Sequence, residues 1–162
     1  MPVIVSDTSP IRALANIDLL YALPALFGQV IVPPAVQEEL LCPPDAAQAV
    51  SLSAVEGIRV VPLKGASRAA VLREILDPGE SEALALAEEL GADAILIDEL
   101  AGRQTGAAIG LQVVGTLAVL LEAKERGLIG QILPLIDRLQ ADFGFFVSRA
   151  LRNHVLRESG EL

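Results

Sequence analysis

Six short, predominantly apolar runs constrain the fold of this 162-residue chain more than any other feature. The runs are too uniformly apolar to be half-exposed strands, and they occupy residues 3–5, 30–32, 58–61, 94–97, 111–114 and 145–147. Strands that are buried on both faces have this composition, which is typical of parallel sheets covered by helices. We therefore predict a mostly parallel central sheet.

Helical patterns separate these runs. They occupy residues 18–26, 34–41, 66–76, 79–90, 116–126, 129–141 and 149–157. Strands that alternate with helices predict a doubly wound α/β sandwich with right-handed crossovers. No internal repeat or long linker interrupts the pattern, so residues 1–162 are expected to form a single domain, with the Pro/Ala-rich segment 42–54 as a short helix or loop at its periphery.

Local signals mark where two of the helices begin and one ends. Asp77 is a capping residue followed by a proline, and Glu80 stands at the third helical position, as in a capping box. Gly91 then ends the helix in the left-handed conformation that glycine adopts at low cost. Gly115 and Thr116 open a second helix directly after a buried strand.

Composition excludes several classes of protein. The single cysteine, Cys42, rules out an intramolecular disulfide framework and a Cys/His zinc cluster. The most apolar stretch, residues 106–121, is interrupted by glycines and Gln112 and is too short for a membrane-spanning helix. The N-terminus lacks the basic residues of a secretory signal. We expect a cytoplasmic protein with no membrane segment.

The charge distribution is strongly acidic and uneven. The formal net charge is -9, which argues against an overall basic surface for nucleic acid. Residues 1–99 carry 15 acidic and 5 basic side chains, whereas residues 100–157 carry 4 acidic and 7 basic ones. This asymmetry indicates an acidic centre beside a mildly basic flank, with ordinary surface variation as the alternative.

Two aspartates follow buried strands. Asp7 comes after the first apolar run and Asp98 after the fourth. Ligands of open α/β sheets bind outside the carboxyl ends of the strands, so neighbouring strands would bring these carboxylates together. Two carboxylates at such a short distance require a proton or a cation between them. Either aspartate alone is more simply a helix cap, but the pair predicts a metal site.

Two glutamates are further candidates. On a helical wheel Glu80 shares the apolar face of its helix, whereas Glu82 lies opposite, and a buried carboxylate needs a partner. The alternative for Glu80 is a capping box with Asp77. In the preceding helix Glu39 lies closer to the apolar face than Glu38, so Glu39 is the better candidate and Glu38 the solvent-exposed residue.

Several segments together resemble the PIN domain, and more narrowly the small prokaryotic PIN-like proteins related to VapC-type toxins. The resemblance covers nearly the whole chain in the right order. The matching segments are VIVSDTSPI from residue 3, PAVQEEL from residue 34, DPGESEALALA from residue 77, ILIDELAGR from residue 95 and VVGTL from residue 113.

The resemblance implies a three-layer α/β/α sandwich and an active site for cleaving single-stranded RNA. It implies that Asp7, Glu39, Glu80 and Asp98 are catalytic and form an acidic cluster for Mg²⁺ or Mn²⁺, and we expect Asp7, Glu80 and Asp98 to be the metal ligands. The expected contacts with substrate or the metal-bound water come from Thr8, Ser9, Arg103 and Thr116. The resemblance also implies a homodimer, and the apolar surface is suited to that or to an antitoxin protein.

Oxygen ligands suit Mg²⁺ or Mn²⁺, which activates water, so no protein nucleophile is needed. Arg103 is expected to meet a phosphate or to pair with a nearby acid, and His154 to be a surface residue. We therefore predict a metal-dependent endoribonuclease, the toxin of a toxin–antitoxin pair. The alternatives are a non-catalytic PIN-like interaction module, whose acids would be spread out or paired with arginines, and a phosphatase or receiver-like protein, which would need a lysine such as Lys64 or Lys124.

Overall fold

The computed structural model describes residues 2–162, and its centre is a sheet of five strands that run parallel to their neighbours. The strands lie in the order β3-β2-β1-β4-β5. Their bounds are β1 (Ile4–Ser6), β2 (Val30–Val32), β3 (Ile58–Val60), β4 (Ala94–Leu96) and β5 (Val113–Val114). The predicted parallel α/β architecture is confirmed, and five of the six apolar runs contain a strand.

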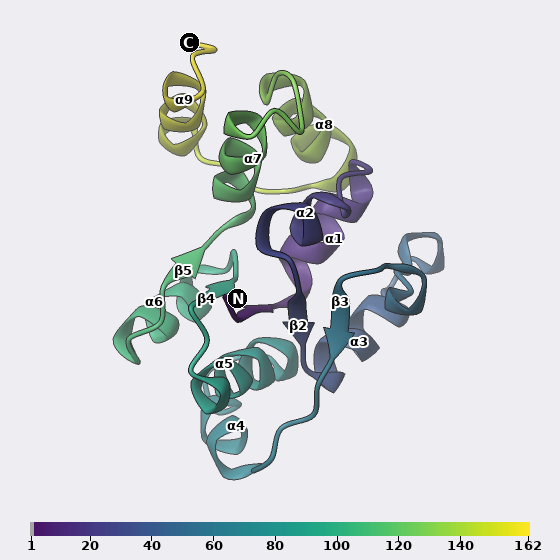
Figure 1. Ribbon diagram of the computed structural model, residues 1–162, viewed down its shortest axis with the longest axis vertical. Coiled ribbons are helices and arrows are strands. Elements are labelled where there is room, and N and C mark those ends of the chain that lie inside the picture. The colour runs from purple at the N-terminus through teal and green to yellow at the C-terminus, as the bar shows by residue number, and fades with distance from the viewer. Residues whose placement is uncertain (1) are drawn as a thin grey trace.

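Helices cover both faces of the sheet, which gives the three layers that the family resemblance implied (Figure 1). One layer contains α1 (Thr8–Asn16), α2 (Ala22–Phe27), α7 (Thr116–Glu125) and α8 (Leu133–Phe143), with α9 (Arg149–Glu158) packed against α7. The opposite layer contains α3 (Pro34–Leu41), α4 (Ser67–Leu72), α5 (Pro78–Leu90) and α6 (Leu100–Ala108). Two 3₁₀ turns, η1 (Ala46–Gln48) and η2 (Leu52–Ala54), follow α3 in the segment predicted to be peripheral.

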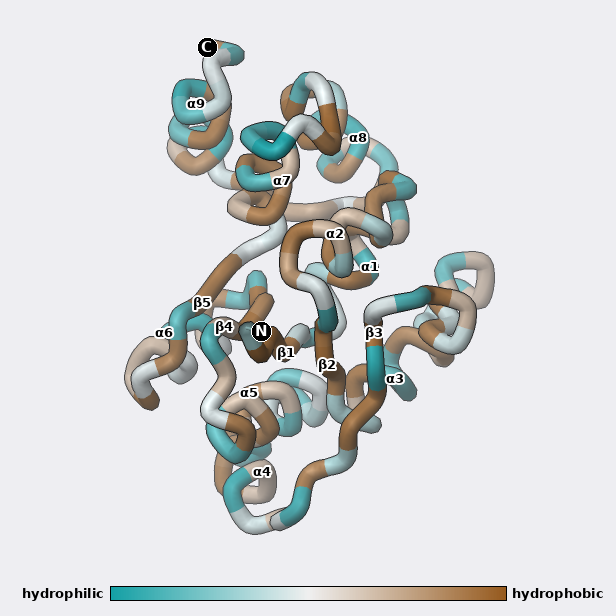
Figure 2. The backbone as a smooth tube through the Cα atoms, in the orientation of Figure 1, coloured by the Kyte–Doolittle hydropathy of each residue, from teal (hydrophilic) through white to brown (hydrophobic). Residues whose placement is uncertain are grey.

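The core lies between the sheet and these helices. Strands β1, β2 and β4 are buried along their whole length, and the chain is hydrophobic there (Figure 2). Helix α5 packs on β1 and β4, and its Ala83 and Ala87 allow a close approach while Leu84 and Leu86 are fully buried. Burying one leucine side chain contributes about 1.5 to 3 kcal/mol. Strands that are covered on both faces therefore account for part of the apolar composition.

Two helices are not among those predicted, and both lie at the edge of the sheet that carries the candidate acids. Helix α1 is short and contains Pro10, but its residues Ile11 and Leu14 are buried. Helix α6 contains Gly102 and Gly106, which lower helix propensity. Side chains from the core, Ile97 beside Gly102 and Leu84 beside Gly106, fill the space that a Cβ would need. Tertiary packing therefore outweighs the local preference.

Two predicted helices begin later in the chain than expected. The helix predicted from residue 18 begins at Ala22 because Asp18 adopts a positive φ of 60°, which interrupts a right-handed helix. The helix predicted from residue 129 begins at Leu133, with Pro134 in its first turn, where a missing N–H costs nothing.

The sixth apolar run, residues 145–147, is not a strand, so that prediction was wrong. The segment joins α8 to α9 without pairing to the sheet. Val147 is buried, but Phe146 is 87% exposed. The composition of three apolar residues does not show whether a neighbouring strand is available to pair with them. This segment crosses the surface near Asp98 instead of extending the sheet.

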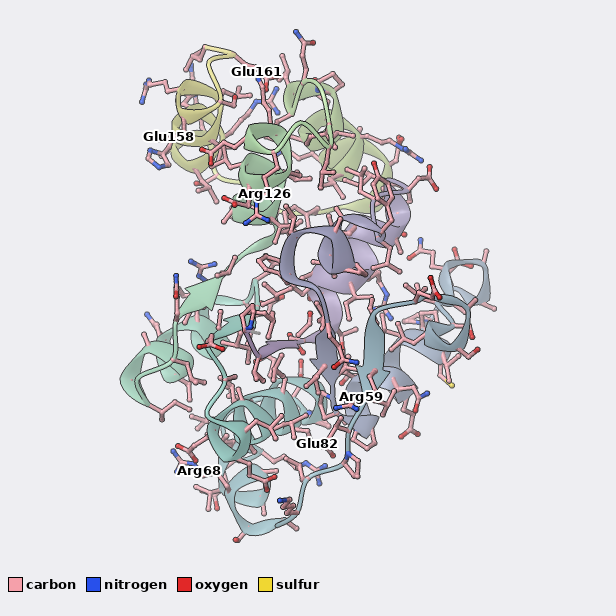
Figure 3. The ribbon with its side chains drawn as sticks, in the orientation of Figure 1. Arg59, Arg68, Glu82, Arg126, Glu158 and Glu161 are labelled. Carbon is pink, nitrogen blue, oxygen red and sulfur yellow. The ribbon has the colours of Figure 1, made fainter. Side chains whose placement is uncertain are left out.

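The C-terminus is anchored to the layer that contains α7 and α8. Glu161 is labelled near the C-terminal end of the chain in Figure 3. Its carboxylate accepts hydrogen bonds from the backbone N–H groups of Ile132 and Leu133 and from Lys124 Nζ, at 2.8 to 2.9 Å. These bonds satisfy N–H groups at the start of α8 that have no partner within the helix. Among residues 2–162, no helix is long and apolar enough to span a membrane.

Candidate metal centre

The carboxyl edge of the central strands carries the two predicted aspartates. Strand β1 pairs with β4, with Ser6 opposite Leu96, and the Asp7 N–H donates to the Leu96 carbonyl at 2.9 Å. Asp7 directly follows β1, and Asp98 follows β4 by two residues. The structure therefore meets the condition on which the sequence argument depended, that the two strands be neighbours.

Three carboxylates meet at this edge. One oxygen each from Asp7, Glu39 and Asp77 lies within 4.8 Å of the other two. The three residues come from the start of α1, from α3 and from the residue before α5. Among residues 2–162 this is the one group of three or more Asp, Glu, His or Cys side chains that lies so close. We call it the acidic triad.

Asp7 is the most deeply buried member of the triad. It stands at the N-cap position of α1, but its side chain forms no capping hydrogen bond, contrary to the simple capping alternative. It is 3% exposed, and its Oδ1 atom has no hydrogen-bond partner in the described chain. Burial, together with the nearby Glu80, Asp77 and Glu39 charges, raises its pKa from 3.8 to about 8, although a backbone hydrogen bond from Thr8 opposes the shift.

Glu39 is held in place by neighbours from two other helices. Thr8 Oγ1 donates a short hydrogen bond to Glu39 Oε2, and the Gly79 N–H donates to Oε1 at 3.0 Å. A Cβ atom at Gly79 would collide with this carboxylate, so glycine is required for the close approach. Glu38 is exposed on the same helix, as the helical wheel predicted.

Asp77 is a triad member that the sequence argument did not assign to the site. Its Oδ1 accepts the Glu80 N–H at 2.8 Å, so it is also the predicted N-cap of α5. In the sequence, the helix-capping role was a sufficient reason for an aspartate at this position, so no site role was assigned to it. The feature of the sequence that could have indicated a site role is its position directly before a helix whose first turn carries a buried glutamate.

Glu80 lies beside the triad without being part of it. It is 6% exposed, and its pKa is raised to about 7 by burial and by the carboxylates of Asp77, Glu99 and Glu39. In the described chain Asp77 accepts from the Glu80 N–H, and no reciprocal bond from the Asp77 N–H to the Glu80 side chain forms. Glu82, in contrast, pairs with Arg73 at 2.9 Å and accepts from the Ala35 N–H.

Asp98 is bound to the start of α7. Its Oδ1 accepts from the Thr116 N–H at 2.8 Å and its Oδ2 from Thr116 Oγ1 at 2.7 Å. Burial raises its pKa, while these bonds and the nearby Arg103 lower it. Asp98 therefore caps α7 and not the helix that follows it in the chain. It is not a triad member, and its assignment with Glu80 as a metal ligand stays a prediction.

Three adjoining cavities line this edge. The triad opens into a cavity of about 240 Å³ that also contains Thr8 and Ser9. Ser9 and Arg12 also line a second cavity, of about 580 Å³. Asp98 and Arg103 line both this second cavity and a third one, of about 530 Å³, which Thr116 also lines. The structure thus places all four predicted substrate contacts along the cavities, and their roles stay predictions.

The triad is chemically suited to a hard divalent cation. Carboxylate oxygens are preferred ligands of Mg²⁺ and Mn²⁺, and Asp7 offers an unpartnered buried oxygen. No ion pair connects Asp7, Glu39, Asp77, Glu80 or Asp98 to any Lys or Arg within residues 2–162. Arg103 lies near Asp98, but none of these carboxylates is held in an ion pair, and a bound cation would relieve their mutual repulsion.

Comparison with known proteins identifies one family. A family model described as a PIN domain, DUF3368, matches residues 3–161. No curated protein and no solved structure matches the chain.

Proposed function

The chain belongs to the PIN-domain family DUF3368, and from this premise we propose that it is a Mg²⁺- or Mn²⁺-dependent endoribonuclease that cleaves single-stranded RNA. The observation that carries the proposal is the acidic triad of Asp7, Glu39 and Asp77 with its unpartnered buried carboxylate oxygen. Burial raises the pKa of Asp7 to about 8, and a bound cation would favour the ionised form of this carboxylate.

The triad residues would hold the metal. When bound, a divalent cation lowers the pKa of water and neutralises charge that develops on the phosphodiester. Thr8 and Gly79 orient Glu39 by hydrogen bonds, and Thr116 orients Asp98. Glu80, whose raised pKa lies near neutrality, is suited to carry a proton beside the triad. In this proposal Asp7, Glu39, Glu80 and Asp98 form the catalytic edge, and Asp77 joins them.

Two rival functions are less well supported. A non-catalytic interaction module predicted acids that are spread out or paired with arginines. Instead, Asp7 and Glu39 meet, Asp77 joins them, and none of the three forms an ion pair in the described chain. A phosphatase or receiver-like site requires a lysine near the aspartates. Lys124 instead donates to the Ser159 carbonyl and to Glu161.

The proposal extends to the biological role. We place the protein in the cytoplasm as the toxin of a toxin–antitoxin pair, with a homodimer as its assembled form. The net charge of -9 makes one protomer a weak electrostatic binder of RNA, and a second protomer would enlarge the surface that contacts the strand. The high apolar content is suited to a dimer interface or to an antitoxin segment.

The test is ribonuclease activity on a panel of single-stranded and structured RNAs, with Mn²⁺ or Mg²⁺ and with EDTA. We expect Asp7→Asn and Asp98→Asn to lower kcat at least about 100-fold, because each removes a charge at the site. The matched control is Glu38→Gln, which neutralises an exposed carboxylate on the same helix as Glu39. It should cleave as the wild type does.

The outcomes separate the functions. Equal activity of the wild type, Asp7→Asn and Asp98→Asn would remove the assignment. Calorimetric titration that detects no Mn²⁺ binding at millimolar concentration, together with no cleavage, would favour the interaction module. A measured dimer mass and co-purification with the product of an adjacent gene would each support the assembly that we propose.

A further inference from the structure

We propose that Phe146, on the segment between α8 and α9, stacks on an unpaired base of a nucleic acid strand bound next to the acidic triad, with Arg103 at its phosphate. This inference rests on the proposed function, because it names how the substrate is held. It assigns a binding role to a segment that the sequence predicted to be a strand.

The subsite lies in the cavity of about 580 Å³ that adjoins the triad. Ser9 and Arg12 line both this cavity and that of the triad. Asp98 and Phe146 line both this cavity and the third one. A strand that enters the triad cavity can therefore continue past Phe146 along one connected surface.

Aromatic side chains gather at this cavity. The chain has four phenylalanines, and three of them, Phe143, Phe145 and Phe146, line it. Leu100, which is 68% exposed, and Leu151 also line this cavity, and we call these apolar residues its rim. A single exposed apolar residue needs no explanation, but a cluster beside a candidate active site indicates a binding surface.

The segment that carries Phe146 is anchored on both sides. The Phe145 N–H donates to the Leu139 carbonyl at 3.0 Å, and Gln140 Nε2 donates to the Val147 carbonyl at 3.3 Å. Ser148 then caps α9 by accepting the Leu151 N–H. The backbone on both sides of Phe146 is thus fixed, which lowers the cost of ordering this segment on binding, while the ring is 87% exposed and accessible to a ligand.

Two arginines line the cavity together with two acids, Asp98 and Glu99. Arg12 and Arg103 line it, and neither forms an ion pair in the part of the chain that the structure describes. Arg12 Nη2 donates to the Glu39 carbonyl, and Arg103 Nη1 contacts the Ile97 carbonyl at 3.4 Å. Arg103 lies near Asp98, but neither arginine is held in an ion pair as Arg152 is with Asp137, so both can turn to a phosphate.

This combination favours a nucleic acid strand over a protein segment. An exposed aromatic ring offers a stacking surface to any unpaired base, and guanidinium groups bind phosphate. Bases inside a double helix already stack on each other and are not available to Phe146. A cation held by the nearby triad would balance the negative charge of a phosphodiester. We therefore assign the cavity to an unpaired nucleotide.

The test measures binding of a fluorescent single-stranded RNA oligonucleotide by anisotropy, in EDTA so that no cleavage occurs. We expect Phe146→Ala to weaken binding roughly five- to 100-fold, Phe146→Leu to weaken it similarly and Phe146→Trp to preserve it, because stacking requires an aromatic ring. An abasic oligonucleotide should bind the wild type and Phe146→Ala equally. The control is Ile75→Ala, at an exposed isoleucine outside the cavities described above.

Cleavage kinetics separate this proposal from the proposed function. With Mn²⁺, Phe146→Ala should raise KM and leave kcat near the wild-type value, whereas Asp7→Asn should lower kcat. Equal oligonucleotide affinity of Phe146→Ala and the wild type would overturn the stacking subsite and leave the rim to a protein segment. Binding that depends on Phe146 without any cleavage by the wild type would support the subsite and refute the nuclease.

Discussion

Replacing Asp7 with asparagine tests the central physical claim, that the fold tolerates a buried carboxylate at a cost. Burial raises the Asp7 pKa from 3.8 to about 8. At pH 7 the unfolded chain ionises this carboxyl, whereas the folded chain keeps the proton. The difference lowers the free energy of unfolding of the metal-free protein by about 4 kcal/mol.

The sign follows from the direction of the shift. The folded state binds the proton more tightly than the unfolded state, so stability is greatest below pH 3.8 and is lost as the pH rises toward 8. Asparagine has nearly the same shape and no charge. We expect metal-free Asp7→Asn to be about 2 to 4 kcal/mol more stable than the wild type at pH 7, with the gap closing near pH 4.

The assay is urea unfolding in EDTA at pH 4 and pH 7, followed by circular dichroism. Glu38→Gln, which removes an exposed charge from α3, should show no comparable gap between the two pH values. Mn²⁺ should then stabilise the wild type and not Asp7→Asn, because a ligand stabilises only the state that binds it. A variant no more stable than the wild type at pH 7, or a gap independent of pH, would refute the reasoning.

Two further predictions concern residues that support the fold and the triad. Gly79→Ala should push the Glu39 carboxylate from its place and weaken Mn²⁺ affinity by about tenfold or more, measured by calorimetry; unchanged affinity would show that Glu39 is not held through Gly79. Glu161→Ala should lower the free energy of unfolding by about 1 to 3 kcal/mol in urea titrations, because two N–H groups at the start of α8 lose their acceptor; wild-type stability would contradict this.

Much of the fold followed from local pattern. Fully apolar runs such as residues 30–32 and 94–97 predicted strands buried on both faces, and helices between them implied a parallel sheet. The helical wheel placed Glu38 in solvent and Glu80 in the interior, and both positions are confirmed. These features depend on periods of two to four residues, which the chain displays directly.

The same local reasoning failed where neighbours decide the outcome. Residues 145–147 have the composition of a buried strand, but the segment has no sheet partner and exposes Phe146. Helix α6 forms although it contains two glycines, because Ile97 and Leu84 pack where side chains would otherwise stand. Neither fact is present in the residues themselves.

The candidate site shows the same division. By itself the sequence determined that Asp7 and Asp98 follow strands and that Asp77 caps a helix, since each depends on adjacent residues. Only the tertiary structure decided that Asp77 joins Asp7 and Glu39, while Asp98 turns to Thr116. The reason is that α3 packs on α5 and the start of α1, and contacts between distant segments are set by the packed core and not by local periodicity.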